Sequence, residues 1–280
     1  MITITAKNKK ILKKSFSFSI KMVVGIIFIF PLIVGLSFAL HTEQELSRLP
    51  LKLFTPNPTL ENFAKVFTDV PIFHYLKNTL ITCLVAITAQ IVFASLAAYG
   101  FVFFKFPLKN FFWTLILATM MVPGEVVIIT NYVTIQNMHL VNTYPGLFLT
   151  SLISGTAIFM MRQYYMQLPK DFKEAAILDG CGDIQFLVRI AVPLSIPTIS
   201  ALAIYLFVHI YNAYFWPLLV TNKDSWRTIQ VGIAYLVTGD VEEYGKVLAA
   251  AMVAMLPTVL AYIFGQDYII KGMVSGGIKG

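Results

Sequence analysis

Charged residues are scarce in this chain. They make up 12% of the 280 residues, whereas hydrophobic residues make up 58%, and the mean hydropathy is +0.76. A soluble domain has about 25% charged residues. So little charge excludes an ordinary water-soluble domain, and the composition indicates that a lipid bilayer is the solvent of this protein.

Residues that bind metals or perform catalysis are also few. The two cysteines, Cys83 and Cys181, have neither a metal-ligand spacing nor the pattern of a secreted disulfide framework. The histidines are too scattered for a metal site or a catalytic triad; they stand at positions 41, 74, 139 and 209. We therefore expect no bound metal and no enzymatic site.

A phosphate-binding loop is missing as well. Such a loop requires G-x-x-x-x-G-K-[ST] at the start of a helix. Gly272 and Gly277 have the glycine spacing, but Ile278 stands where lysine is required. The chain is therefore not expected to bind ATP by this route.

Long uncharged runs are what the sequence does contain. Residues 22–40, 78–104 and 247–266 carry no charge, and a transmembrane helix needs about 20 apolar residues. The first run could belong to a signal peptide, but it is longer than a signal core and lacks a clear cleavage site before His41. We predict an all-α integral membrane protein. Six spans fit best, near 20–40, 78–103, 110–131, 144–161, 195–220 and 247–266.

The basic residues predict an orientation. Six spans place both termini on one side, and that side, which includes the 162–189 loop, receives 14 of the 21 lysines and arginines. Cytoplasmic loops are enriched in these residues. We expect both termini and this loop to be cytoplasmic.

No internal repeat is evident, and no low-complexity linker suggests a second domain. Residues 1–21 form a cytoplasmic segment, 22–74 the first span with an external segment, 75–270 a core of five spans, and 271–280 a cytoplasmic tail. The proline-rich external piece leads into a short amphipathic helix.

The predicted cytoplasmic loop contains EAAILDGCGDIQFLVRIAVP, residues 174–193. Its pattern predicts a helix with Asp171 as N-cap, a break at Gly180 and Gly182, and a second helix. Small alanines on the exposed face would allow another protein to approach closely. The alternative is a connector lying on lipid headgroups, which favours a basic face. Four acids balance four bases in residues 162–189, so a docking element is favoured.

This loop resembles the EAA loop of binding-protein-dependent ABC importers. That pattern is EAA, three residues, G, nine residues, then I-x-L-P, and Val192 stands where leucine is usual. The matching residues are Glu174, Ala175, Ala176, Gly180, Ile190 and Pro193, and Asp179 matches the EAA-x-x-DG form of sugar permeases.

The resemblance extends from about residue 75 to the end of the chain. YNAYFWPLLV at 211–220 is similar to W-N-x-F-x-W-P-L of carbohydrate permeases, and QDYIIKGMVSGGIKG resembles the tail of the same family. LAAYGFVFFKFPLKN matches the end of their second span. The likeness points to permeases paired as in the maltose importer, and equally to the permease of the glycerol-3-phosphate importer.

The resemblance implies a non-catalytic permease with the six-helix fold of type I ABC importers, in the bacterial cytoplasmic membrane. Its partners would be a second homologous permease, an extracytoplasmic solute-binding protein and a cytosolic ATPase dimer that holds ATP and Mg. Pairing with itself is the alternative to a heterodimer. The substrate would be a di- or oligosaccharide or, alternatively, glycerol-3-phosphate or a related polyol phosphate.

The same resemblance assigns roles to residues. The ATPase-coupling residues would be Glu174, Ala175, Ala176, Asp179, Gly180 and Pro193. The tail would reach between the ATPase subunits through Gly276, Gly277, Ile278 and Lys279. A frayed terminus is the alternative for the tail.

Three further residues are candidates for the translocation path. Glu125 is an acid in or at the edge of a span, which is usually functional, although it could also lie at the external interface or pair with a partner span. Asn212, beside Tyr211, could bind sugar hydroxyls, or bond between spans. A stand-alone secondary transporter would show repeats and paired charges, and a membrane enzyme a polar cluster. The EAA loop favours the importer over both.

Overall fold

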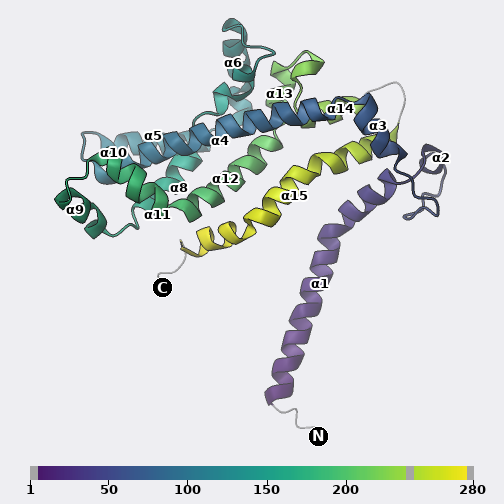
Figure 1. Cartoon of the computed structure of the whole chain (residues 1–280), viewed down its shortest axis with the longest axis horizontal. Coiled ribbons are helices and arrows are strands. Elements are labelled where there is room, and N and C mark those ends of the chain that lie inside the picture. The colour runs from purple at the N-terminus through teal and green to yellow at the C-terminus, as the bar shows by residue number, and fades with distance from the viewer. Residues whose placement is uncertain (1–5, 238–242, 276–280) are drawn as a thin grey trace. The chain divides into compact units, whose positions relative to one another are not determined.

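All the regular secondary structure in the described part of the chain is helical. The computed structural model describes residues 6–237 and 243–275, and these contain α-, 3₁₀- and π-helices and no strand (Figure 1). The chain divides into two compact units. The first comprises Met1–Pro71 with Tyr235–Val253, and the second comprises Ile72–Ala234 with Ala254–Gly280. The predicted all-α membrane fold is confirmed.

The first unit contains α1 (Ala6–Ala39), α2 (Glu43–Leu46), α3 (Glu61–Asp69) and the first residues of α15 (Tyr244–Ser275). The Lys14–Ala39 part of α1 is long and apolar enough to cross a membrane. The short amphipathic helix predicted after the prolines is α3, so that prediction is confirmed. Helix α2, which was not predicted, begins with a capping box in which the Thr42 side chain and the Glu45 carboxylate each accept a backbone N–H of the other residue.

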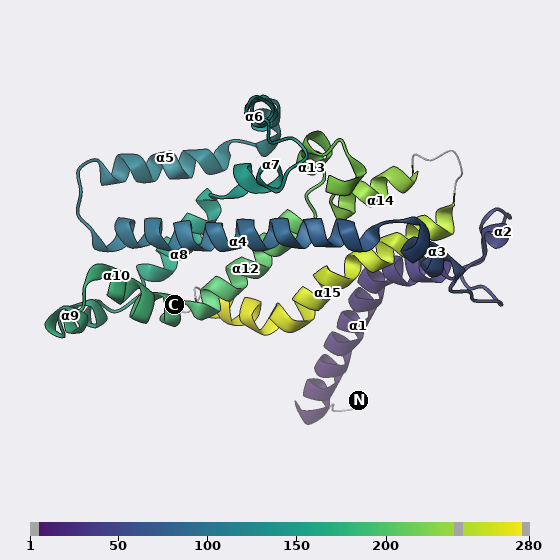
Figure 2. The same ribbon diagram turned by 45° about the horizontal axis from the view of Figure 1, so that its top comes forward.

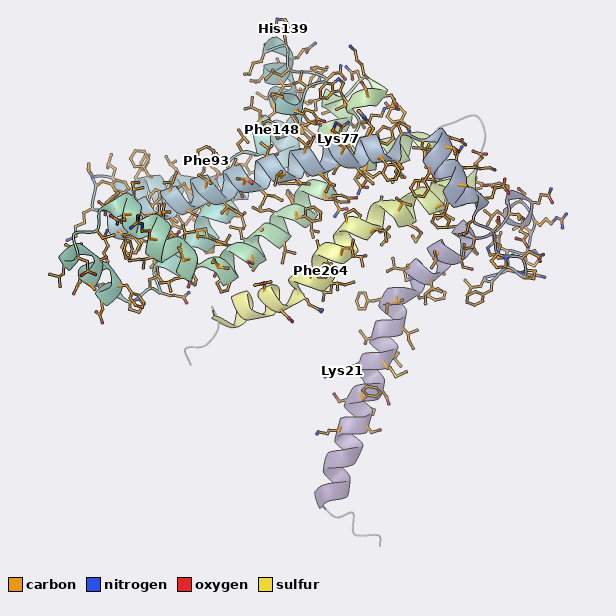
Figure 3. The ribbon with its side chains drawn as sticks, viewed as in Figure 1. Lys21, Lys77, Phe93, His139, Phe148 and Phe264 are labelled. Atoms are coloured by element: carbon orange, nitrogen blue, oxygen red, sulfur yellow. The ribbon has the colours of Figure 1, made fainter. Side chains whose placement is uncertain are left out.

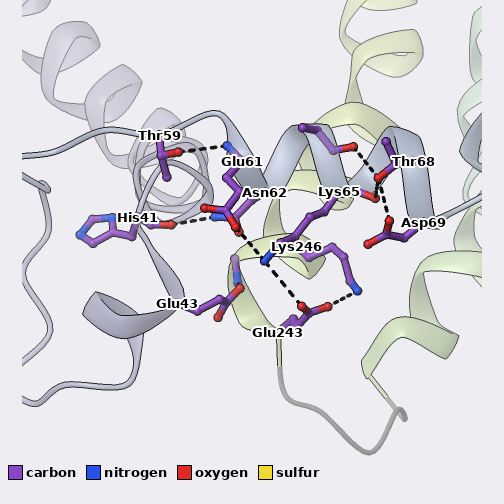
Figure 4. Close-up of polar contacts among 12 residues, drawn as sticks. His41, Glu43, Thr59, Glu61, Asn62, Lys65, Thr68, Asp69, Glu243 and Lys246 are labelled. Atoms are coloured by element: carbon purple, nitrogen blue, oxygen red, sulfur yellow. Dashed lines mark hydrogen bonds and ion pairs between the residues drawn. The ribbon is translucent and has the colours of Figure 1, made fainter.

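A buried amide holds the first unit together. Asn62 of α3 is buried, and its side-chain amide donates to the carbonyl oxygens of Ala39 at 2.9 Å and His41 at 2.7 Å (Figure 4). These carbonyls lie at the C-terminal end of α1, where a helix leaves its last carbonyls without partners. Around this amide, Lys65 pairs with Glu61 and Glu243, and Lys246 also pairs with Glu243.

The second unit is built around α4 (Ile72–Phe103), a continuous helix of 32 residues. Helices α8 (Gly155–Tyr165) and α12 (Ile196–Tyr211) pack along it (Figure 2). Their shared core is rich in alanine, which allows the helices to approach closely. Large apolar side chains such as Phe93 of α4 and Phe264 of α15 remain exposed on the surface of this unit, as expected for a protein solvated by lipid (Figure 3).

Three of the predicted spans are interrupted. The 110–131 span is α5 (Lys109–Met121) followed by α6 (Gly124–Asn137), with a bend of 96° at Pro123. The 144–161 span is α7 (Tyr144–Phe148), η1 (Leu149–Ser151) and α8, bent by 49°. Three helices are long enough to span alone, and up to six spans result if each bent pair counts as one, within the residues described.

The 195–220 span is interrupted at a different place. Helix α12 ends at Tyr211, and α13 (Phe215–Val220) starts after a short break. The segment before α12, Asp183–Leu194, meets it at 76°. The remaining elements are η3 (Asp224–Trp226) and α14 (Ile229–Val237). Apolar composition predicted one continuous helix over 195–220. Composition does not reveal a break that changes the direction of a helix without introducing a charged residue.

Candidate functional site: a helical hairpin and a membrane cavity

Residues 170–194 form a helical hairpin at one end of α4 (Figures 1 and 2). Helix α9 (Lys170–Leu178) is followed by α10 (Asp183–Phe186), the π-helical η2 (Leu187–Ala191) and α11 (Val192–Leu194). The predicted order of helix, glycine break and helix is confirmed. The N-cap of α9 is Pro169, however, so the prediction of Asp171 as N-cap is wrong; Asp171 lies in the first turn.

The turn of the hairpin depends on Gly180. Its φ is +73°, the left-handed region that glycine enters at little cost. The Gly180 N–H donates to the carbonyl of Ile177 at 3.0 Å, and the Cys181 N–H donates to that of Ala176 at 2.8 Å. This pair of bonds is a Schellman motif, which satisfies the last carbonyls of α9. The predicted turn at Gly180 therefore has a backbone basis.

The inner face of the hairpin is anchored in the core of the second unit. Ala176 is only 5% exposed and packs in the same apolar cluster as Phe186, Leu187 and Ala191. We had expected small alanines on the exposed face; that is wrong for Ala176 and holds for Ala175, which is exposed. The two neighbours differ because adjacent residues on a helix point about 100° apart, at 3.6 residues per turn.

The outer face of the hairpin combines acids with apolar residues. Glu174 and Asp179 are exposed. Between them, Ile177 is exposed and Leu178 is 88% exposed. The sequence pattern did not predict this exposed apolar pair. Because Ala176 faces the core and successive helical residues turn by about 100°, Leu178 lies on the far side of α9. Pro193, in α11, is also exposed.

A polar triad joins the hairpin to α4. The Lys173 Nζ donates to the Asp183 carboxylate at 2.6 Å and to the Tyr99 hydroxyl oxygen at 2.7 Å. The Tyr99 hydroxyl in turn donates to Asp183 at 2.8 Å. Burial lowers the pKa of Lys173, but the hydrogen bonds to Asp183 and Tyr99 outweigh it, and the pKa lies above its ordinary value. The sequence did not predict this triad, because Tyr99 lies 74 residues before Lys173.

A cavity of about 380 Å³ lies further along the second unit. The bend after α5 brings Glu125, in the first turn of α6, to its wall. Of the residues that the structure describes, Glu125 is the only acid, lysine or arginine in the lining. The polar and aromatic residues of the lining include Thr79, Thr82, Asn131, His209, Tyr214 and Trp216.

The other two path candidates do not line this cavity. Tyr211 is buried, and its hydroxyl donates to the carbonyl of Ala254 at 2.7 Å. Asn212 is exposed; its amide donates to the carbonyl of Val208 and accepts from Gln230. Both make bonds within the unit, which was the structural alternative to a role in the path.

A second cavity of about 230 Å³ shares Thr150, Ser151, His209 and Ile210 with the first. Gln90 of α4 lines it; this buried amide donates to the carbonyl of Ser151 at 2.6 Å, and its side-chain oxygen has no hydrogen-bond partner among the described residues. Gln90 was not singled out from the sequence, and His209 was named among the scattered histidines but not chosen as a path residue. The available signal for Gln90 was an amide side chain in the middle of the uncharged run 78–104.

Two further expectations concern the C-terminal tail and metal binding. The tail residues Gly276, Gly277, Ile278 and Lys279 lie outside the described residues. Within residues 6–237 and 243–275, no group of three or more His, Cys, Asp or Glu side chains could hold a metal ion.

Membrane-length helices, bent spans around a cavity with one carboxyl side chain, and a projecting helical hairpin define this chain as a multi-pass helical membrane protein. It belongs to the family of binding-protein-dependent transport system inner membrane components, which matches residues 90–274.

Relatives with known roles cover nearly the whole chain. The arabinooligosaccharides transport system permease protein AraQ of Halalkalibacterium halodurans is 31% identical over 92% of this chain and 93% of its own. The sn-glycerol-3-phosphate transport system permease protein UgpE of Rhizobium meliloti is 32% identical over 90% and 93%. A chain from the crystal structure of a bacterial ABC transporter involved in alginate import shares the fold, with a TM-score of 0.82 at 17% identity over 96% and 99%.

Proposed function

We propose that this chain is a non-catalytic permease subunit of an ATP-driven carbohydrate importer, in which the hairpin docks on a cytosolic ATPase subunit. The observation that carries the proposal is the hairpin itself. Its inner face is anchored in the core through Ala176, while its outer face presents Glu174, Asp179 and the exposed Leu178. An anchored element with an exposed apolar and acidic face is suited to transmit force from a partner.

The proposed partner must supply what this chain lacks. ATP and Mg would be bound and hydrolysed by the ATPase subunits, and this chain would contribute no cofactor. The apolar pair Ile177 and Leu178 would enter a pocket, since burial of apolar surface drives most protein–protein association. Glu174 and Asp179 would pair with basic residues at the rim of that pocket. Gly180 would fix the turn after α9, and Pro193 would fix the far end of the second half of the hairpin.

Copurification tests this docking. Full-length chain would be purified from membranes that also contain the ATPase, as native protein and as Glu174→Arg and Leu178→Asp. The matched control is Glu61→Arg, the same charge reversal at an exposed glutamate of α3. Loss of the ATPase from both hairpin variants, but not from the control, supports docking. Retention by all variants together with normal uptake overturns it.

The substrate is proposed to be an uncharged di- or oligosaccharide. Relatives include permeases named for arabinooligosaccharides and for sn-glycerol-3-phosphate, so relationship alone leaves both open. The cavity favours the first. Its described lining contains Glu125 and neither lysine nor arginine, so it offers a phosphate no permanently charged cation. Its Trp216 and Asn131 suit sugar rings and hydroxyls.

Uptake competition separates the two substrates. Proteoliposomes with the complete importer would take up a labelled neutral trisaccharide in the presence of excess unlabelled trisaccharide or glycerol-3-phosphate. We expect only the sugar to compete, and Glu125→Lys to impair uptake more than Glu125→Gln. If glycerol-3-phosphate competes, and competes equally well with the Glu125→Gln variant, the assignment of an uncharged sugar substrate is excluded.

The remaining assembly follows from the same proposal. A second homologous permease would complete the membrane pathway, an extracytoplasmic binding protein would deliver the sugar, and the tail residues Gly276–Lys279 would contact the ATPase pair. Both termini and the hairpin would be cytoplasmic. Single cysteines at Glu174 and Glu61, in a chain lacking Cys83 and Cys181, test the orientation, since a membrane-impermeant thiol reagent should reach them from opposite sides.

A further inference from the structure

We propose that Tyr99, Lys173 and Asp183 form the mechanical link through which movement of the hairpin is transmitted to α4 and so to the cavity. This inference rests on the proposed function, because it assumes that an ATPase moves the hairpin. It assigns a positioning role to three residues whose identity the EAA pattern does not specify.

The three groups make a closed set of contacts between three elements. Tyr99 belongs to α4, Lys173 to α9 and Asp183 to the start of α10, and each side chain bonds to both of the others. Hydrogen bonds with a charged member are short and directional, and these span 2.6 to 2.8 Å. A displacement of α9 therefore changes bond lengths at α4 and α10 at once.

The surroundings of Lys173 strengthen this link. Its side chain is 17% exposed, and its Nζ lies 4.6 Å from the ring centroid of Phe186 and 5.4 Å from that of Tyr99. Both aromatic residues are buried. A cation held over aromatic faces and partly shielded from water interacts more strongly than an exposed one.

Few other side-chain contacts restrain the position of helix α9 along the core. Within the part of the chain that the structure describes, Lys173 is the only side chain of α9 that makes a hydrogen bond, and Ala176 is its only buried residue. Apolar contacts are non-directional, and a single methyl group allows sliding along the core. The triad therefore supplies the directional restraint on the helix that carries Glu174.

Helix α4 connects this restraint to the cavity. Tyr99, Gln90, Thr82 and Thr79 lie on one continuous helix, and the last three line the two cavities. From Tyr99 to Thr82 is about 25 Å along the axis at 1.5 Å per residue. Since α4 is unbroken over this distance, a shift applied at Tyr99 reaches the cavity wall with little loss.

The ratio of sugar transported to ATP hydrolysed tests the link in the complete reconstituted importer. Lys173→Met and Tyr99→Phe should each lower this ratio, by about fivefold or more for a coupling free energy of ordinary size. Lys170→Met is the matched control, because Lys170 is an exposed lysine of the same helix. Lys173→Arg should recover part of the ratio.

The double variant and copurification distinguish the outcomes. If the triad acts as one unit, Lys173→Met with Tyr99→Phe should be no worse than either alone. The ATPase should still copurify with each variant, since the outer face is unchanged. A native ratio in both single variants, or additive losses, overturns the link while docking stands. Failure of the native chain to stimulate or retain the ATPase overturns the proposed function itself.

Discussion

Two lysines of this protein have similar partners and different surroundings. In the first unit, Lys65 pairs with Glu61 at 3.2 Å and Glu243 at 3.7 Å, and its side chain is 29% exposed. In the second, Lys173 bonds to Asp183 and Tyr99 at 2.6 and 2.7 Å and lies over two aromatic rings. From this comparison we expect Lys173 to restrain the fold more strongly than Lys65, although Lys65 has two acids beside it, because Lys173 is more shielded and makes shorter, directional bonds.

The two clusters also differ in which residue holds the structure. In the first unit that residue is the neutral Asn62, which is buried and bonds two backbone carbonyls at the end of α1. The ion pairs surround it and remain partly solvated (Figure 4). In the second unit the charged residue Lys173 is itself the shielded residue that bonds to both of its partners. Five predictions separate these contributions, from the largest expected effect to the smallest.

The largest effect is expected at Asn62. Asn62→Ala should lower the free energy of unfolding by about 2–4 kcal/mol, because it removes two bonds and leaves buried carbonyls without partners. Thermal unfolding in detergent would measure this loss. A decrease no greater than that of Lys65→Met would show that the first unit is held by its ion pairs after all.

Lys173→Met should destabilise the protein by about 1–2 kcal/mol, because it removes the charged donor of the triad while keeping apolar cover over Phe186 and Tyr99. Lys170→Met is the control on the same helix and should have little effect. Equal losses for the two variants in the same unfolding experiment would remove the distinction between shielded and exposed lysines.

Gly180→Ala should destabilise by about 1 kcal/mol, because a side chain at φ +73° is strained even though a Cβ would meet no neighbour. Gly182→Ala is a matched control two residues away: its φ is −72°, and a Cβ there would also meet nothing. The two variants should therefore differ in unfolding temperature. If Gly182→Ala proves the more costly, the turn is not restrained where we place it.

Lys65→Met is expected to cost less than about 1 kcal/mol, since surface ion pairs contribute little and are screened by salt. Unfolding should be followed at low and high ionic strength. The small difference from the native chain should shrink further in high salt. A salt-insensitive loss comparable to that of Lys173→Met would contradict the comparison.

The smallest effect concerns Glu45. Its bonds to the Thr42 backbone and the Thr55 hydroxyl hold its pKa below the ordinary 4.5. The stabilisation is present above that ordinary pKa and is lost as the pH falls through the lower value of the folded state. The difference in unfolding temperature between native chain and Glu45→Gln should thus narrow below pH 4.5. An increase in this difference in unfolding temperature at lower pH would contradict the prediction.

Local features of the fold could be predicted from the sequence. The apolar runs identify membrane helices, because the length needed to cross a bilayer is fixed by its thickness. The Gly180 turn and the helix on either side were predicted for a similar reason, since backbone preferences act over a few residues. Glu125 was recognised as unusual because an acid in an apolar span is costly wherever it lies.

Tertiary structure decided the rest. Composition could not show that Pro123 turns the chain by 96° and brings Glu125 to a cavity, or that Tyr211 is satisfied internally by Ala254. Nor could it pair Lys173 with Tyr99, 74 residues earlier in the chain. A helical sequence determines which residues share a face. Which neighbour that face meets depends on how distant helices pack, and that choice determines whether a charge, a hydroxyl or an amide is exposed, shielded or bonded.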